Sequence, residues 1–253
     1  MYTVRLCFYG ELNDFIVTER RGIQYELRFP QARSVKDLIE SEGVPHPEID
    51  RILINGKPQM LDALVVDGDC IGVYPSGHPV DFAVESHLGR PTLSMPQFMA
   101  DVHLGKLTRL LRLLGLDCEY DNFDLTDERL AEISHGENRV LLTRDRALLK
   151  RSMVVHGIYI RGDEPEAQVF EILERIDLNR VIRPFTRCLK CNGCLAPISR
   201  EEATSRVPPA TWLNMETFHH CPDCRRVYWQ GAHWDMLNAF VERVKARLAC
   251  TSV

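Results

Sequence analysis

The most specific chemical signal in the sequence is a cluster of cysteines toward its C-terminal end. Five of the nine cysteines lie between Cys188 and Cys224, and four of them form two C-x2-C pairs, Cys188–Cys191 and Cys221–Cys224. Each pair can turn two sulfur atoms toward one ion, and four thiolates complete the tetrahedral shell of a structural Zn²⁺. Such a shell leaves no open coordination position. The sequence therefore predicts a zinc site that stabilises the fold and takes no part in catalysis.

Other ligands lie close to these two pairs. Cys194 is a third candidate in the first pair, and a histidine could replace one sulfur, the candidates being His219, His220 and His233. Four ordinary buried thiols are the alternative without a metal. The tight second pair favours a matching first pair, so we expect zinc on the four cysteines of the two C-x2-C pairs.

A second group of candidate ligands is acidic. Asp101, Asp121 and Asp145 each follow a short apolar segment with the pattern of a strand, and Asp127 and Glu128 open the helix after the second segment. Ligands of an open α/β sheet bind off the carboxyl ends of its strands. Acids on one such rim repel each other unless a cation joins them, and Mg²⁺ or Mn²⁺ suits these oxygen ligands and phosphodiester hydrolysis. Each acid alone could instead cap a helix. Together they predict a magnesium or manganese site.

A basic stripe begins directly after the first of these acids. His103, Lys106, Arg109 and Arg112 are spaced by three, which places them on one drifting face of a helix. Arg144 is the neighbour of the third acid. Positive side chains beside an acidic metal site would hold a phosphate backbone. The alternative is a solvated helix face whose arginines pair with nearby acids.

The elements that must position these residues fall into consecutive blocks. Residues 1–75 read as a small α+β domain in the order β-β-α-β-β, with a capping box at Ser34 and a turn at Asn55-Gly56. Residues 76–96 read as a linker with a short strand at 80–84. Residues 97–180 alternate strand and helix, which implies a parallel sheet with right-handed crossovers. Residues 181–253 hold the cysteine pairs and an amphipathic closing helix at 235–249.

Composition and charge limit the class of protein. The 253 residues are 45% hydrophobic and 26% charged, which is typical of a globular chain. Because there is no apolar run of about 18 residues and no signal-peptide pattern at the start, we expect a cytoplasmic protein without a membrane span. The net charge is −5, but residues 176–253 carry 11 basic and 7 acidic residues. A basic tail is compatible with a nucleic-acid partner.

Two families share these motifs. The segments Leu53–Lys57 and Asp67–Asp69 resemble the ubiquitin-like β-grasp fold of sulfur-carrier proteins. The longer motifs are similar to the PIN-like ribonuclease domain at the C-terminus of the Mut-seven exonucleases: Ala100–Leu107, Leu111–Asp117, Tyr120–Asn122, Asp127-Glu128, Leu142–Asp145, Arg187–Asn192 and Cys221–His233. The second resemblance covers about residues 96–235. It implies an α/β, PIN-like parallel sheet flanked by helices, an N-terminal ubiquitin-like β-grasp domain and a C-terminal zinc ribbon.

The resemblance also implies a function. It implies a metal-dependent ribonuclease whose acidic core is Asp101, Asp127 and Asp145, with Asp121 and Glu128 beside them and Thr143 orienting a ligand or water. Its cofactors would be structural zinc and catalytic magnesium or manganese, and its partner would be RNA. His103 departs from the family pattern, because an apolar residue is expected there.

Three other functions compete with this one. A non-catalytic RNA-binding or adaptor protein would keep the fold and lose the activity. A haloacid-dehalogenase-type phosphatase needs a D-x-D start, whereas Val102 and His103 follow Asp101. Sulfur-carrier chemistry needs a free Gly-Gly carboxylate, but here the last strand of the first domain continues through Pro75 into the next one. We therefore expect a docking or structural role for the ubiquitin-like domain, with a protein partner as one form of it.

Overall fold

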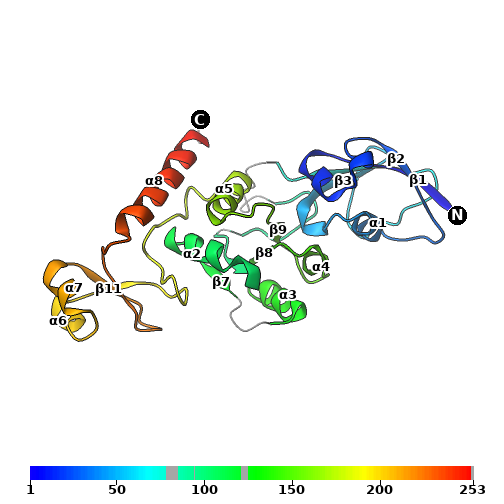
Figure 1. Ribbon diagram of the computed structural model, residues 1–253. Helices are drawn as coiled ribbons and strands as arrows, with labels where there is room; N and C mark the ends of the chain where they lie inside the picture. Colours follow the sequence, from blue (N-terminus) through cyan, green and yellow to red (C-terminus); the bar gives the residue numbers. More distant parts are fainter. Residues whose placement is uncertain (78–84, 94, 121–124, 252–253) are drawn as a thin grey trace. The chain divides into compact units, whose positions relative to one another are not determined.

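The computed structural model describes residues 1–77, 85–93, 95–120 and 125–251 (Figure 1). Its contacts divide the chain into two compact units, residues 1–103 with 121–161 and residues 104–120 with 162–253, and each unit is described by itself. The strand predicted at 80–84 lies outside the described residues. Among the helices of the described segments, none has the length and apolar character needed to cross a bilayer. The domain boundaries at 75, 96 and 180 stay predictions.

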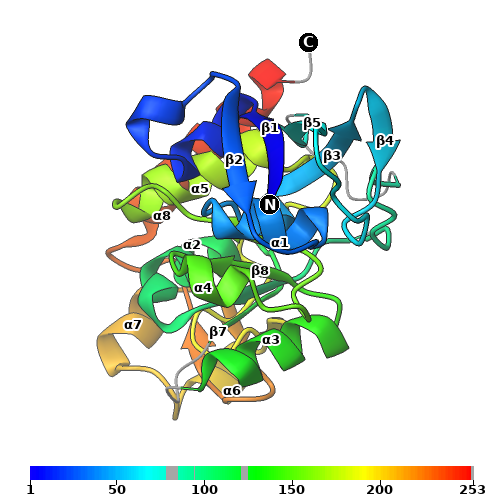
Figure 2. The same ribbon diagram turned by 90° about the vertical axis from the view of Figure 1, so that its right-hand side faces the viewer.

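The first unit opens with a mixed five-stranded sheet. Its strands lie in the order β2-β1-β5-β3-β4, and β1 and β5 run parallel. The strands are β1 (Tyr2–Phe8), β2 (Tyr25–Phe29), β3 (Ile49–Ile54), β4 (Lys57–Gln59) and β5 (Cys70–Pro75). Helix α1 (Val35–Ser41) lies beside this sheet (Figure 2), and three short 3-10 helices join the rest: η1 (Gly10–Phe15), η2 (Thr18–Arg20) and η3 (His46–Glu48). This is the β-grasp-like arrangement that the sequence predicts.

Local chemistry explains why these elements begin and end where they do. The hydroxyl of Ser34 accepts a hydrogen bond from the Asp37 amide at 3.1 Å and so caps α1, as predicted. Asn55 and Gly56 both have positive φ, 52° and 77°, which is the backbone that a two-residue hairpin needs. That turn lets Lys57 pair with Ile54, so the structure adds the short strand β4 to the four strands that the sequence predicts.

The other sheet strands of this unit are parallel. Strand β8 (Val140–Thr143) pairs with β6 (Phe98–Ala100) on one side and with β9 (Gly157–Tyr159) on the other. Helices α3 (Asp127–Gly136) and α4 (Arg146–Leu149) pack with them around a small apolar core that includes Met99, Leu130, Leu141 and Leu149. The predicted strand–helix alternation is confirmed for this part of the chain.

A buried polar contact joins the two sheets of the first unit. The side chain of Glu48 is 0% exposed; its Oε1 accepts from the Tyr159 amide at 2.6 Å, and its Oε2 lies 3.6 Å from a guanidinium nitrogen of Arg161. The Tyr159 ring packs against the cores of both sheets. Nearby, Nε2 of His46 donates to the Val154 carbonyl at 2.8 Å. The N-terminal sheet is therefore built into this unit through residues 154–161.

The second unit contains helices and a small antiparallel sheet. The sheet has the order β10-β11-β12 and packs around Phe218. Helices α2 and α5 pack on each other. The elements are α2 (Gly105–Leu113), β7 (Cys118–Tyr120), α5 (Pro165–Arg175), β10 (Ala196–Ile198), α6 (Arg200–Ala203), α7 (Pro209–Asn214), β11 (Phe218–His220), β12 (Val227–Tyr228) and α8 (Trp234–Thr251). The 3-10 helix η4 (Val102–Leu104) lies at the boundary between the units. The predicted closing helix is α8.

Loss of the buried Glu48 carboxylate should destabilise the protein. Glu48→Ala leaves the Tyr159 amide and Arg161 without this acceptor in the interior, so we expect the free energy of unfolding to fall by about 3 kcal/mol. Glu26→Ala is the control, because it removes a carboxylate of β2 that is 62% exposed and lies 3.5 Å from Arg28. It should change the free energy of unfolding by less than about 0.5 kcal/mol. Chemical denaturation compares the two variants. Equal stabilities would contradict the structural role of Glu48.

His156 should make the protein sensitive to acid. Burial and then the positive charge of Arg90 lower its pKa from 6.5 to about 4. Between these two pH values, His156 is protonated in the unfolded chain but neutral in the folded chain. The free energy of unfolding is therefore highest above pH 6.5 and falls as the pH drops toward 4. His156→Gln should flatten this loss, which is on the order of 1–3 kcal/mol. His135→Gln, at an exposed position of the same unit, is the control. Thermal melts across the pH range that coincide for both variants would refute the assignment.

Candidate functional site

One buried hydroxyl connects two of the predicted acidic residues. Strands β6 and β8 pair in parallel with Ala100 opposite Leu142, so their carboxyl ends meet. Thr143, at the end of β8 and 0% exposed, donates its hydroxyl to Oδ2 of Asp101 at 2.6 Å. The same hydroxyl oxygen accepts from the Asp145 amide at 2.9 Å. Asp101, Thr143 and Asp145 therefore form one hydrogen-bonded group at the end of two neighbouring strands.

The two acids of this group have different surroundings. Asp101 is buried, with 5% of its surface exposed. Asp145 is exposed and caps α4, because its Oδ1 accepts from the Ala147 amide at 2.7 Å and from the Leu148 amide at 3.4 Å. The sequence allows each acid to be a helix cap instead of a metal ligand, and Oδ1 of Asp145 does cap a helix. A cap of this kind also fixes the direction of the second oxygen.

In the described part of the chain, no contact joins Asp127 or Glu128 to this group. Asp127 lies in the first turn of α3, whose N-terminus Thr126 caps by accepting from the Arg129 amide. The Oδ2 of Asp127 is 3.9 Å from Arg151. Glu128 is exposed, and Asp121 lies outside the described residues. Within the described part of the chain, the four cysteines are the one group of three or more potential ligands whose donor atoms all lie within 4.8 Å. Convergence of the acids on one ion therefore stays a prediction.

The predicted basic stripe separates into exposed and buried members. His103, Lys106, Arg109 and Arg144 are exposed. Arg112 is 3% exposed; its Nε donates to the Cys118 carbonyl at 2.8 Å and a terminal nitrogen donates to the Lys190 carbonyl at 2.9 Å. A spacing of three falls short of a helical turn by about 60° at each step, so the last member rotates onto the packed face. The structure corrects the expectation that Arg112 lies on an exposed surface.

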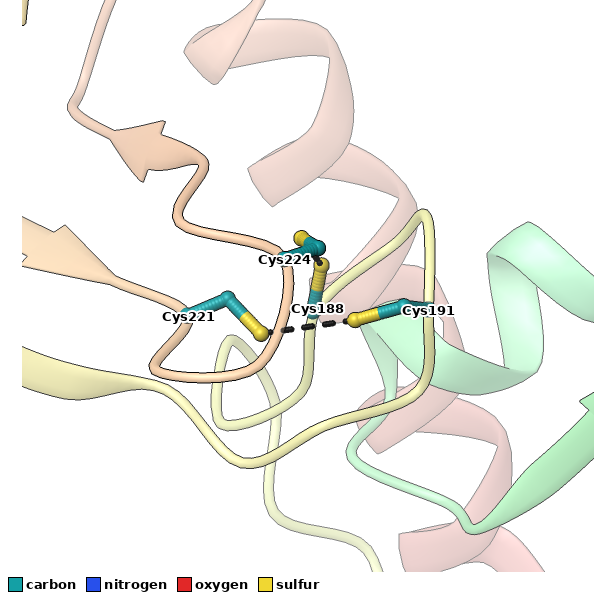
Figure 3. A group of neighbouring side chains, drawn as sticks. All are labelled: Cys188, Cys191, Cys221 and Cys224. Carbon is teal, nitrogen blue, oxygen red and sulfur yellow. Dashed lines mark hydrogen bonds between the residues drawn. The ribbon is translucent and has the colours of Figure 1, made fainter.

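The four cysteines of the two C-x2-C pairs gather in the second unit. Figure 3 shows their side chains pointing toward one another from two loops. The sulfur of Cys188 lies 3.5 Å from that of Cys224, and the sulfur of Cys191 lies 3.4 Å from that of Cys221. Tetrahedral Zn–S bonds of about 2.3 Å separate neighbouring sulfurs by about 3.8 Å, so the four sulfurs fit one zinc ion. Cys194 is exposed and outside this group.

The two cysteine loops have the same backbone structure. The residue after each second cysteine, Asn192 or Arg225, has a positive φ of 69° or 63°. Its amide donates to the carbonyl of the first cysteine, at 3.0 Å to Cys188 and at 2.8 Å to Cys221. This shared turn directs both sulfurs of a pair to the same side. Asn adopts positive φ at little cost, whereas Arg pays more for it.

Neighbouring groups favour a negative charge on one sulfur. Burial opposes ionisation of Cys188, but hydrogen bonds from the Tyr228 hydroxyl at 3.0 Å and from the amides of Cys191 and Lys190 lower its pKa to about 6. Burial raises the pKa of Cys191 to about 12. Cys118 lies outside the cluster, and burial raises its pKa to about 12 as well. Zinc binding at neutral pH must displace the protons of those sulfurs that remain thiols, and these hydrogen bonds to Cys188 favour its thiolate.

Side chains next to the cysteines attach the first cysteine loop to residues 117–119, at the start of β7. The Asn192 amide group donates to Asp117 at 2.8 Å and to Glu119 at 3.0 Å, and its oxygen accepts from the Cys118 amide at 3.1 Å. Arg187 pairs with Asp117 at 3.1 Å. The sequence motifs alone predict no such role for Asn192, Arg187 and Asp117. The place of Arg187 and Asn192 directly before and after the first C-x2-C pair was the available signal.

Two family models match this chain. A family model described as the Mut7-C RNAse domain matches residues 96–241, and one described as Mut7-C ubiquitin matches residues 1–81. Among solved structures, "Putative molybdopterin converting factor, subunit 1" from Pyrococcus furiosus is similar at 20% identity and a TM-score of 0.24, over 30% of this chain and 100% of that chain. The curated proteins gave no match.

The cysteine cluster should bind one zinc ion per chain. Cys224→Ser removes one of four sulfurs and should release the metal and lower the melting temperature of the protein, because metal binding energy is here folding energy. Cys194→Ser, a thiol outside the cluster, is the matched control and should keep both. Metal analysis of protein purified without chelator measures the zinc content. Metal-free wild-type protein, or zinc retained by Cys224→Ser, would disprove the site.

Proposed function

Because this chain belongs to the Mut7-C RNase domain family, we propose that it is a metal-dependent ribonuclease that hydrolyses RNA phosphodiester bonds. The observation that carries the proposal is the hydrogen-bonded group of Asp101, Thr143 and Asp145 at the ends of two parallel strands. Strand ends of this kind are where open α/β sheets bind their ligands. The match of residues 1–81 to the Mut7-C ubiquitin model supports the same proposal, because it places the companion domain of this family in front of the RNase domain.

The chemistry of the donor atoms supports a hard divalent cation. Asp101 and Asp145 offer carboxylate oxygens, which Mg²⁺ and Mn²⁺ prefer. Asp101 is almost wholly buried, and a buried carboxylate needs a positive partner or several donors to offset its lost hydration. We assign Asp127, Glu128 and Asp121 to the same site as further oxygen ligands. When bound, the cation would lower the pKa of a water molecule and neutralise charge on the phosphate.

The residues of the chain would position these groups. Thr143 holds Oδ2 of Asp101 and the amide of Asp145, which leaves the other oxygen of each carboxylate in a fixed direction. Preorganisation of this kind is what a reaction needs when charge must be stabilised without rearrangement. Lys106, Arg109 and Arg144 are exposed cations, and we assign them to the phosphates of the RNA backbone.

The ubiquitin-like segment has a structural part in this proposal. The Arg146 guanidinium, next to Asp145, lies 5.0 Å from the centre of the Phe15 ring. The Lys150 ammonium, just past the end of α4, donates to the Glu40 carbonyl at 2.7 Å. Both contacts support the helix that Asp145 caps. The N-terminal domain would thus hold α4 in place, and a further protein partner for it stays a prediction.

Removal of one carboxylate should abolish cleavage without unfolding the protein. Asp101→Asn and Asp145→Asn keep the side-chain shape and remove a charge that the cation needs, so we expect single-turnover cleavage with saturating Mn²⁺ to fall by about 100-fold or more. Asp62→Asn, at an exposed position of the N-terminal domain, should cleave at the wild-type rate. The assay uses mixed single-stranded and structured RNAs, with Mg²⁺, Mn²⁺ and EDTA arms.

Two outcomes would overturn the proposal. Wild-type cleavage by both Asp101→Asn and Asp145→Asn would place any nuclease activity elsewhere. RNA binding by the wild-type chain without metal-dependent cleavage would favour the alternative, a non-catalytic RNA-binding or adaptor protein.

A further inference from the structure

The second unit contains a hollow of about 540 Å³ whose lining includes Lys106 and Arg109, two of the cations that the proposed function assigns to RNA phosphates. Its apolar lining comes from four leucines on three separate segments: Leu110 and Leu113 of α2, Leu189 of the first cysteine loop and Leu237 of α8. Pockets for small ligands are typically about 300–1,000 Å³. The hollow is therefore large enough for one planar ring with its attached groups.

Charged side chains of both signs line the same hollow. Lys106 and Arg109 come from α2, and Glu164 and Glu166 come from the start of α5. In the described part of the chain, neither Lys106 nor Arg109 forms an ion pair, and Glu166 pairs with Arg243 at 2.7 Å. Two exposed cations that have no ion-pair partner among the described residues, in a hollow that is also lined by leucines, form a site for an anion that carries apolar surface as well.

This set of groups matches the parts of a nucleotide. A phosphate is an acceptor for Lys and Arg, a base offers a flat face that packs on apolar side chains, and base amino or ribose hydroxyl groups donate to a carboxylate. A fatty acid would leave Glu164 with no donor, and an inorganic anion would leave the leucines without a partner. We propose that this hollow binds one nucleotide of a single-stranded RNA, with its phosphate at Lys106 and Arg109 and its base on the leucines.

The inference rests on the proposed function, because it takes RNA as the substrate and adds a recognition site for it. An RNA strand can place one base in this hollow only if that base is unpaired and turned out of any duplex. The site therefore favours single-stranded RNA over a perfect duplex. Glu164, as the carboxylate without an ion pair among the described residues, would distinguish bases by whether they present a donor to it.

Binding is tested on the full chain in EDTA, where the acidic site holds no metal. The probes are the four nucleoside 5′-monophosphates, a single-stranded RNA hexamer and a perfect RNA duplex, measured by calorimetry and fluorescence anisotropy. Lys106→Ala/Arg109→Ala should weaken binding of the monophosphates and the hexamer by about tenfold or more. Lys245→Ala/Arg247→Ala removes the same charge from exposed positions of α8 and should change binding less than about twofold. Glu164→Gln should alter the ranking of the four monophosphates.

The outcomes separate this inference from the ribonuclease proposal. Asp62→Asn, at an exposed position outside the hollow, should bind the monophosphates like the wild-type chain, and because the assay contains EDTA its result does not depend on cleavage at the acidic site. No saturable monophosphate binding up to about 10 mM, or equal effects of the two double variants, would overturn the nucleotide site while leaving cleavage to stand or fall by its own test. If Lys106→Ala/Arg109→Ala loses duplex and hexamer binding equally, these cations contact only the RNA backbone, and that result would also overturn the nucleotide site.

Discussion

The hydrogen bond between the Thr143 hydroxyl and Asp101 is the contact on which the proposed chemistry depends. At 2.6 Å and fully buried, it lets a carboxylate remain in the interior, where an unpaired charge is costly. The parallel pairing of β6 and β8 makes this contact possible, because both strands end at the same edge of the sheet. The Asp145 amide, bonded to the same hydroxyl, continues the arrangement into α4. One small side chain thus connects two strands, two acids and a helix cap.

Polar contacts also join the N-terminal sheet to the strands beside it. Glu48 is the clearest case, because its carboxylate accepts from the Tyr159 backbone while lying near Arg161. A domain that acted only as a mobile carrier would have no need of buried charge in such a place. The contacts of Phe15 with Arg146 and of His46 with Val154 agree with a supporting role. Any influence of the N-terminal sheet on the neighbouring strands would have to act through these contacts.

The second unit is organised around the cysteine cluster. Asn192 supplies three hydrogen bonds to residues 117–119, and Arg112 adds bonds to Cys118 and Lys190. A metal held by the four sulfurs would fix the loop from which these contacts start. Folding of the segment that follows α2 would then be linked to metal binding. The leucine of that loop, Leu189, lines the hollow, so the metal would also shape the proposed nucleotide site.

The sequence by itself determined the features that depend on neighbours along the chain. The spacing of Cys188 and Cys191 within one turn, and the cap at Ser34, follow from local geometry, and the structure confirms both. Periodicity likewise predicted four strands of the first sheet, but it did not predict the short strand β4. Tertiary structure alone decided that Arg112 is buried and that Glu48 meets Tyr159, because the partners in these contacts are distant in the chain. A repeat of residue types indicates which residues share a face of a helix. It does not indicate which segment covers that face, and burial depends on that segment.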